Sequence, residues 1–265
     1  MNIIDCVTYF DEDLILDIRL NILNKYVSKF IISEGKFDHR GNERDLKFKL
    51  ENFRKFKDKI IYIVVDNFPN LNDPWKMLEY QRNSSQKYLK QFDKNDFVLV
   101  SDVDEIPNPI SINNFLKSKK DIGVFNQLFF YYKLNLINST SPNWLGSKIC
   151  RLKKLKSPNW LREYKAKQYP WWRVDKPENL NIIENGGWHF SFLYDVDGII
   201  KKIKSFQHTE FDKEDIKNPK FIKNMINTGQ DIFKRGFKFN KIDIDDRFPE
   251  YIKNNQGKFS NWIQV

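Results

Sequence analysis

Three carboxylates follow directly after an apolar run near the middle of the chain. Residues 97–101 read Phe-Val-Leu-Val-Ser and predict a buried strand, and Asp102, Asp104 and Glu105 come next, before Pro107. Because side chains alternate along a strand, Asp102 and Asp104 point the same way at its carboxyl end, where open α/β sheets bind ligands. Neighbouring carboxylates repel each other unless a cation lies between them, and Mn2+ or Mg2+ accepts both carboxylate and diphosphate oxygens. The segment indicates a metal site, although a solvated acidic turn explains the same residues, since Asp-x-Asp alone is common.

Strand and helix patterns alternate through the first half of the chain. Short β-branched or aromatic runs, separated by segments with helical spacing, predict an α/β fold with a doubly wound, mainly parallel sheet. Residues 130–180 lack helical periodicity and carry turn signals, which predicts a β-rich insertion, and C-terminal helices are expected at about 196–206 and 219–228. The predicted strands cover residues 3–7, 30–33, 60–65, 97–101 and 122–130.

One predicted helix carries an arginine on its buried face. Asp73 is placed as the N-cap and Pro74 as the first helical residue. A buried arginine needs a partner, so Arg82 either forms a structural salt bridge or reaches the acidic end of the neighbouring strand. Arg19 raises the same question on the first helix, and there we favour a structural ion pair. The buried face of the predicted helix is Trp75, Leu78, Arg82, Ser85, Leu89 and Phe92.

Composition limits the classes of protein. The 265 residues are 40% hydrophobic with 23 Phe, which is enough for a core, and two cysteines provide neither a disulfide framework nor a Cys-based zinc site. No apolar run approaches a transmembrane segment and residues 1–6 do not resemble a signal peptide, so we expect a cytoplasmic chain. A net charge of +10 favours anionic partners. The basic and aromatic stretch 151–173 suits nucleic-acid bases, sugar rings or an ordinary protein surface.

Several strings occur in a fixed order along almost the whole chain. They are Ser101-Asp-Val-Asp-Glu-Ile-Pro107, Phe10-x3-Leu14-x2-Asp17-Ile18-Arg19, Glu34 with Gly41 and Leu46-Lys47-Phe48, Gln81-Arg82-Asn83, Gly187-Trp-His-Phe-Ser191, Lys204-Ser-Phe-Gln-His-Thr-Glu-Phe211 and Pro249-x-Tyr251-Ile252-x2-Asn254. Together they resemble glycosyltransferase family 17, whose best-known members transfer N-acetylglucosamine to N-glycans. The resemblance implies a GT-A type fold, an inverting transfer from a UDP-sugar to an oligosaccharide or glycoconjugate, and a divalent metal, usually Mn2+.

The resemblance also implies roles for individual residues in a single domain, 1–265. Residues 1–130 are expected to bind the nucleotide-sugar and 131–265 the acceptor. Asp104, with Asp102 directly or through water, is expected to hold the metal, and His189 joins them because the preceding glycine pair permits close approach to a ligand. Glu210 is our first choice of catalytic base, with Asp195 and Glu105 as alternatives. The residues expected to bind the substrates are Thr8, Phe10, Glu12, Glu34, Lys47, Arg82, Asn83, Trp188 and His208.

Two other classes of protein remain as alternatives. A haloacid-dehalogenase-like phosphatase also uses Asp-x-Asp after a strand, but there the motif normally follows the first strand rather than the fourth. A basic nucleic-acid-binding protein would use the stretch 151–173, which contains no recognised binding motif. We therefore expect sugar substrates and no nucleic acid.

Overall fold

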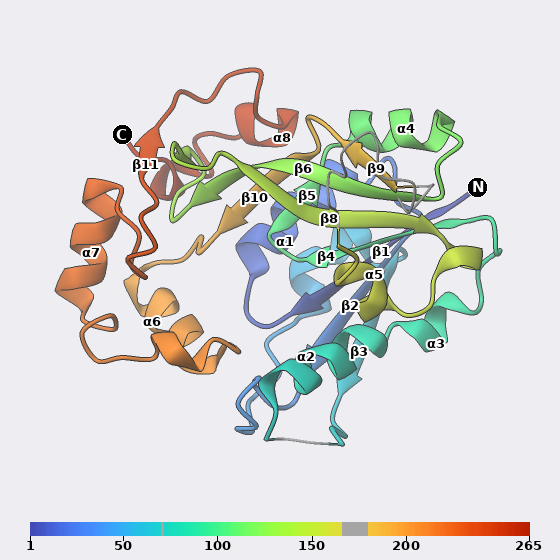
Figure 1. Cartoon of the computed structure of the whole chain (residues 1–265), viewed down its shortest axis with the longest axis horizontal. Coiled ribbons are helices and arrows are strands. Elements are labelled where there is room, and N and C mark those ends of the chain that lie inside the picture. Colours follow the sequence, from blue (N-terminus) through green and yellow to red (C-terminus); the bar gives the residue numbers. More distant parts are fainter. Residues whose placement is uncertain (70–71, 166–179) are drawn as a thin grey trace, which may run out of the picture.

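The computed structural model describes residues 1–69, 72–165 and 180–265, and in this part of the chain a mixed sheet of eleven strands runs through the molecule (Figure 1). The strand order is β11-β7-β6-β8-β4-β1-β2-β3, with β10 paired to β5 and β6 and with β9 paired to β6. The strands are β1 (Ile3–Tyr9), β2 (Lys29–Gly35), β3 (Ile60–Val65), β4 (Phe97–Asp102), β5 (Glu105–Pro107), β6 (Ile122–Tyr131), β7 (Leu136–Asn138), β8 (Asn143–Arg151), β9 (Leu180–Ile183), β10 (Gly187–Ser191) and β11 (Phe239–Lys241).

The N-terminal half of this sheet is parallel. Strand β1 lies between β2 and β4 in parallel register, and β3 continues the parallel set on the far side of β2. Strand β8 then pairs antiparallel with β4 and β6, so the sheet changes direction beside the acidic segment. All five strands expected from the sequence are present, and the α/β, mainly parallel fold class is confirmed.

Helices cover both faces of the sheet. The α-helices are α1 (Asp13–Leu23), α2 (Pro74–Asn83), α3 (Gln86–Leu89), α4 (Pro109–Lys117), α5 (Pro158–Arg162), α6 (Val196–Ser205), α7 (Pro219–Thr228) and α8 (Glu250–Lys253). Short 3-10 helices are η1 (Leu50–Phe56), η2 (Leu152–Lys154), η3 (Thr209–Phe211) and η4 (Ser260–Trp262). None of these helices, in the ranges that the structure describes, is long and apolar enough to cross a membrane.

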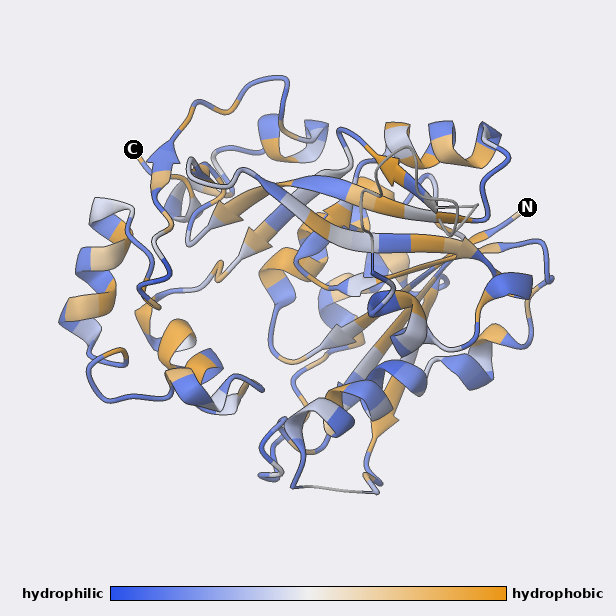
Figure 2. Cartoon of the chain, in the orientation of Figure 1, coloured by the Kyte–Doolittle hydropathy of each residue, from blue (hydrophilic) through white to orange (hydrophobic). Residues whose placement is uncertain are grey.

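Alternation along the strands separates the cores. In β1, Ile3 and Val7 face the layer that contains α1, η1, α4 and α8, whereas Ile4 and Cys6 face α2, α3 and α5. A third apolar cluster lies under α6 and α7 at the other end of the sheet. Figure 2 shows the central strands as largely hydrophobic and the surrounding helices as two-sided. The sheet is therefore buried on both faces, as a parallel sheet requires.

The predicted helix begins as expected, and most of its predicted face is buried: Leu78, Arg82, Ser85 and Leu89. The Asp73 carboxylate accepts hydrogen bonds from the backbone N–H groups of Trp75 and Lys76, which confirms the N-cap. The buried residues of α2 are Met77, Leu78, Gln81 and Arg82, and Trp75 is 54% exposed, so its predicted burial was wrong. The reason is that Met77 and Gln81, rather than Trp75, complete the stripe beside Leu78 and Arg82.

The second half is less purely β than expected. Strand β8 joins the main sheet between β6 and β4, and Ser157-Pro158-Asn159, which we interpreted as a turn, begins helix α5. The Ser157 side chain accepts from the backbone N–H of Trp160, and Pro158 occupies the first helical turn. Residues 166–173 of the predicted basic stretch lie outside the described residues. The expected helices near 196–206 and 219–228 are present as α6 and α7.

Candidate active site

A cavity of about 470 Å³ opens at the carboxyl ends of β1, β2 and β4. Its walls come from two groups of elements. One consists of the ends of the parallel strands with α2, and the other of β6, β8 and β10 with α6 and the segment 206–237. Among the residues predicted from the sequence, those that line the cavity are Thr8, Phe10, Glu12, Arg82, Asp102, Asp104, Glu105, His189, His208 and Glu210.

Arg19 donates hydrogen bonds to the backbone of the acidic segment. This side chain is fully buried on α1 and pairs through two nitrogens with the Asp5 carboxylate of β1, at 2.8 and 2.6 Å. Its remaining donors reach the Ser101 hydroxyl and the backbone carbonyls of residues 102, 103 and 105. The structural ion pair expected for Arg19 is thus confirmed. The same guanidinium fixes the backbone that carries the carboxylates.

Asp102 lies between two arginines. Its Oδ1 accepts from Arg82 Nη2 at 2.8 Å and its Oδ2 from Arg162 Nη2 at 2.9 Å. Burial opposes ionisation of this carboxyl, but the two guanidinium groups outweigh it and hold the pKa of Asp102 well below its usual range. Arg82 therefore does reach the acidic end of the neighbouring strand. Both carboxylate oxygens of Asp102 already have a charged partner.

Asp104 is held more loosely than Asp102. His189 Nε2 lies 3.7 Å from one of its oxygens and Lys202 Nζ lies 3.8 Å from the other. Burial would raise the pKa of Asp104, but the neighbouring His189 and Lys202 side chains outweigh it and lower that pKa. The carboxylate is therefore ionised at neutral pH, and its oxygens remain available to a further cationic partner.

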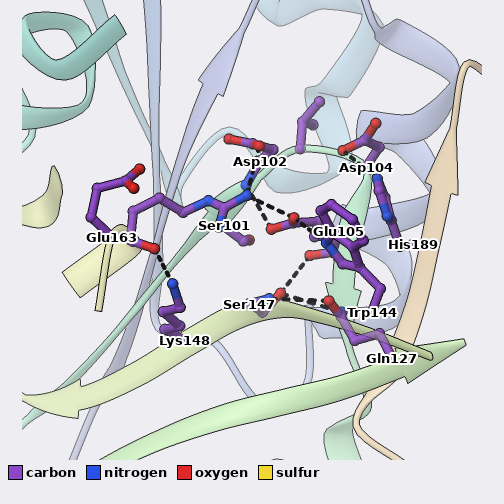
Figure 3. A network of polar contacts seen from close by, with 12 residues as sticks. Ser101, Asp102, Asp104, Glu105, Gln127, Trp144, Ser147, Lys148, Glu163 and His189 are labelled. Carbon is purple, nitrogen blue, oxygen red and sulfur yellow. Dashed lines mark hydrogen bonds and ion pairs between the residues drawn. The ribbon is translucent and has the colours of Figure 1, made fainter. Parts of the chain in front are cut away.

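Glu105 is a buried anchor. The carboxylate of this 1% exposed residue accepts from Arg162 Nη2 at 2.8 Å, from Trp144 Nε1 at 2.7 Å and from the Asp102 backbone N–H at 3.3 Å (Figure 3). Its carbonyl accepts from the Ser147 hydroxyl. A carboxylate with this many donors and almost no exposure is better suited to holding its neighbours in place than to removing a proton from a substrate.

The other two candidate bases differ in position. Glu210 lies on η3 at the cavity wall, with 60% of its side chain exposed and its Oε1 2.9 Å from His208 Nδ1. Its own backbone N–H and His208 lower the pKa of the Glu210 carboxyl, so it is ionised at neutral pH. Asp195 caps α6 by accepting from the Gly198 N–H at 2.8 Å and does not line the cavity. The position of Asp195 is explained by helix capping.

Four predicted substrate-binding residues lie outside the cavity wall. The Glu34 carboxylate is buried against the backbone N–H groups of residues 47 and 48, and Lys47 directs its ammonium toward Asp45. The Asn83 side chain accepts from the N–H of residue 159, and the Trp188 indole donates to the carbonyl of residue 247. Each has a structural partner, and none contributes to the site proposed below.

Among the residues at or beside the cavity that were not anticipated, Arg162, Lys202 and Trp144 contact the acidic segment. Lys202 directly precedes Ile203, which lies on the buried face of α6. Its position at the edge of that face could therefore be inferred once the helix was placed. Trp144 is the second residue of β8, where alternation alone does not tell which face meets the cavity. Arg162 ends a five-residue helix within the basic and aromatic stretch 151–173, and that composition did not indicate a carboxylate partner.

The residues present fit a metal whose ligands come partly from the protein and partly from a substrate. No group of three or more His, Cys, Asp and Glu side chains suited to holding a metal is found in the residues that the structure describes. Asp104 and His189 nevertheless bring one carboxylate and one imidazole together, and the buried Nδ1 of His189 has no hydrogen-bond partner within the described chain. Mn2+ accepts carboxylate oxygen and often completes its shell with phosphate oxygens.

Comparison with known proteins places the chain in a family. The sequence profile described as Glycosyltransferase family 17 matches residues 1–238. This chain belongs to glycosyltransferase family 17. The human β-1,4-mannosyl-glycoprotein 4-β-N-acetylglucosaminyltransferase is 26% identical to this family 17 chain, in an alignment that covers 86% of the chain and 48% of the human protein. The chain thus spans about half the length of that relative.

Solved structures resemble this family 17 chain only distantly. S. aureus TarS is 13% identical, with a TM-score of 0.41, and the match covers 77% of this chain and 38% of TarS. Glucosyl-3-phosphoglycerate synthase from Mycobacterium tuberculosis, solved in complex with Mn2+ and UDP-glucose, is 10% identical with a TM-score of 0.36, over 95% and 91% of the two chains. Likenesses at this level add nothing to the argument for function.

Family membership sets aside the phosphatase and nucleic-acid alternatives. Three basic residues of the stretch have acidic partners: Arg151 and Lys154 pair with Asp121, and Arg162 pairs with Asp102. This family 17 chain is a glycosyltransferase whose acidic segment lies at the centre of its cavity.

Proposed function

We propose that this family 17 glycosyltransferase transfers N-acetylglucosamine from a UDP-sugar to a hydroxyl group of a glycan, with inversion at the anomeric carbon and with Mn2+ as cofactor. The observation that carries the proposal is the position of Asp104: its ionised carboxylate lies in the cavity at the end of β4, beside His189 and Lys202, and both of its charged contacts are long. The choice of sugar follows the name of the human relative.

Asp104 and His189 would hold the metal, which when bound neutralises the negative charge that develops on the leaving diphosphate. Lys202 adds a cation beside the other oxygen of Asp104. Its ammonium lies over the rings of Phe192 and Tyr194 at 5.1 and 5.3 Å from their centres, so its direction is fixed. Fixed cations at a leaving group stabilise the transition state without reorganisation.

Glu210 is proposed to take the proton of the acceptor hydroxyl. It is the one of the three candidate carboxylates that both lines the cavity and is open to a substrate. Inversion requires a base on the face of the sugar opposite the leaving group, because the reaction is a single displacement. His208 orients the carboxylate through the 2.9 Å contact between Nδ1 and Oε1.

The first experiment measures UDP release from UDP-N-acetylglucosamine, UDP-glucose, UDP-galactose and GDP-mannose with and without Mn2+. We expect UDP release from UDP-N-acetylglucosamine, and we expect EDTA to abolish it. The anomeric proton signal of the product in the NMR spectrum should show the configuration opposite to that of the donor sugar. Absence of UDP binding by calorimetry with Mn2+ present would contradict the proposal.

The second experiment replaces the base. Glu210→Gln should lower kcat by about 100-fold to 10,000-fold with little change in UDP affinity, since general base catalysis contributes that much. Asp195→Asn serves as the control and should retain kcat, because Asp195 caps a helix outside the cavity. Normal turnover of Glu210→Gln would remove Glu210 from the mechanism.

A further inference from the structure

One aromatic side chain of the cavity is exposed although it is rigidly held. Trp144 is 37% exposed, whereas the neighbouring ring of Phe129 is 4% exposed. The Trp144 indole N–H donates to the buried Glu105 carboxylate at 2.7 Å, which fixes the orientation of the ring about its long axis. A large apolar ring that is fixed and open to solvent in a cavity is characteristic of a binding surface.

Two further rings pack against Trp144. Its centre lies 4.8 Å from that of His189 and 5.5 Å from that of Phe129, while Phe129 and His189 stack on each other at 4.9 Å with 7° between their planes. Figure 3 shows Trp144 reaching toward Glu105 near His189 and Asp104. The exposed ring of Trp144 is therefore connected, through His189, to the carboxylate at the centre of the proposed reaction.

The side of the cavity that holds Trp144 identifies its ligand. Nucleotides bind at the carboxyl ends of parallel strands, which here means the wall of Thr8, Gly35 and Gln81 from β1, β2 and α2. Trp144 lies on the other wall, on the antiparallel strand β8. With the diphosphate at Asp104, the space over Trp144 is left for the sugar that receives the transferred group.

We propose that Trp144 is the stacking platform for the pyranose ring of the acceptor. This inference rests on the proposed function and extends it by naming a binding surface for the second substrate. A pyranose ring presents a face of C–H groups, which packs on an aromatic plane through apolar contact and weak C–H interactions. The ligand is therefore a pyranoside with an unobstructed apolar face, and the ring that stacks needs no charge.

The test separates acceptor binding from donor binding. Protein labelled with 15N-tryptophan is saturated with UDP and Mg2+, and the indole signal of Trp144 is assigned by its loss in Trp144→Phe. Methyl β-mannopyranoside, methyl β-glucopyranoside and methyl β-N-acetylglucosaminide are then titrated as probes. We expect at least one pyranoside to shift the Trp144 signal in a saturable way while the signal of Trp262, which lies on η4 outside the cavity wall, stays in place.

A kinetic comparison uses a matched control on the same strand. Trp144→Ala should raise the KM for the best pyranoside acceptor at least tenfold and leave the affinity for UDP within twofold of the wild type. The acceptor KM of Trp144→Phe should lie between those of the wild type and Trp144→Ala. Leu145→Ala is the control, because Leu145 is the next residue of β8, is 41% exposed and does not line the cavity. It should change neither constant.

The possible failures are distinguishable. A wild-type protein that binds no UDP contradicts the proposed function itself. A protein that binds UDP but whose Trp144 signal responds to none of the pyranosides overturns the platform, as does an unchanged acceptor KM in Trp144→Ala. Equal weakening of UDP and pyranoside binding in Trp144→Ala would also overturn it, because the ring would then serve the fold of the whole cavity.

Discussion

The guanidinium of Arg162 lies 2.9 Å from the Asp102 carboxylate, and the same nitrogen lies 2.8 Å from Glu105. Arg162 is on α5 and the two carboxylates are on β4 and β5, so this contact joins elements that are 60 and 57 residues apart. Together with Arg82 it occupies both oxygens of Asp102. The two aspartates of the acidic segment therefore differ in their contacts, since both oxygens of Asp102 pair with arginines at 2.8 and 2.9 Å whereas the charged contacts of Asp104 are 3.7 and 3.8 Å long. From this difference we expect a structural role for Asp102 and a role in substrate binding for Asp104.

Substitution of each aspartate should separate these roles. Asp102→Asn leaves two arginines without their charge partner, and because its side chain is 38% exposed we expect a loss of about 2 kcal/mol in the free energy of unfolding, between the values for surface and buried pairs. Asp104→Asn should change that free energy by less than about 1 kcal/mol, since its contacts are 3.7 and 3.8 Å long. The turnover of Asp104→Asn should fall by about 1,000-fold.

Urea unfolding and UDP release, measured on both variants, check this pair of expectations. The reverse order, with an unstable Asp104→Asn and an inactive but stable Asp102→Asn, would show that the assignment of the two roles is inverted.

Mn2+ and UDP should bind cooperatively. Both oxygens of Asp102 already accept from an arginine, and the proposed ligands Asp104 and His189 would supply only part of a coordination shell, so we expect diphosphate oxygens to complete it. We expect UDP to raise the affinity for Mn2+ at least tenfold, and by linkage Mn2+ to raise the affinity for UDP by the same factor. Electron paramagnetic resonance of free Mn2+ during titration, with and without UDP, measures this. Equal Mn2+ affinity under both conditions would mean that the protein alone forms a complete metal site.

Arg82→Lys tests the planar fork of the arginine. Arg82 donates to Asp102 at 2.8 Å, to Asn159 at 3.2 Å and to Glu163 at 3.3 Å, and so connects α2 with β4 and α5. A lysine keeps the charge but not two nitrogens in one plane. We expect the free energy of unfolding to fall by about 1–2 kcal/mol, together with a lower turnover. Lys76→Arg, at an exposed position of the same helix, should leave both quantities unchanged.

The sequence was most informative where local patterns determine structure. The strands, the N-cap at Asp73 and the position of Asp102 and Asp104 at a strand end all follow from alternation and capping within a few residues. A buried arginine on α2 could also be foreseen, because its neighbours form a helical stripe. Which carboxylate it would meet was already among the alternatives, since only one acidic cluster follows a neighbouring strand.

Contacts that depend on the path of the chain were not predictable in this way. Arg162 reaches Asp102 only because the chain after β8 turns back into α5, and a five-residue helix has too little periodicity to be recognised. Trp188 was predicted to bind substrate and Asp195 was an alternative base; in the structure the Trp188 indole donates to a distant carbonyl, and Asp195 caps α6 through a local contact. The identity of wall residues such as Lys202 and Trp144 likewise required knowing which elements meet at the cavity.

Lys148 should make stability depend on pH in the alkaline range. This lysine of β8 is 6% exposed and donates to the carbonyl of Arg162, and burial followed by the charge of Arg162 lowers its pKa to about 8 from an ordinary value of 10.5. Below pH 8 the lysine is charged in both the folded and the unfolded chain, so the folded state bears the full cost of burying that charge. Between the two pKa values the unfolded chain binds a proton that the folded chain has released, and the free energy of unfolding therefore rises with pH.

Relative to Lys148→Met, which has no proton to lose, the wild type should gain about 2.5 kcal/mol between pH 7 and pH 10. Urea unfolding of both proteins at several pH values measures this difference, and Lys154→Met, at a half-exposed lysine, serves as the control. A constant difference between wild type and Lys148→Met across this range would mean that Lys148 keeps its proton in the folded state.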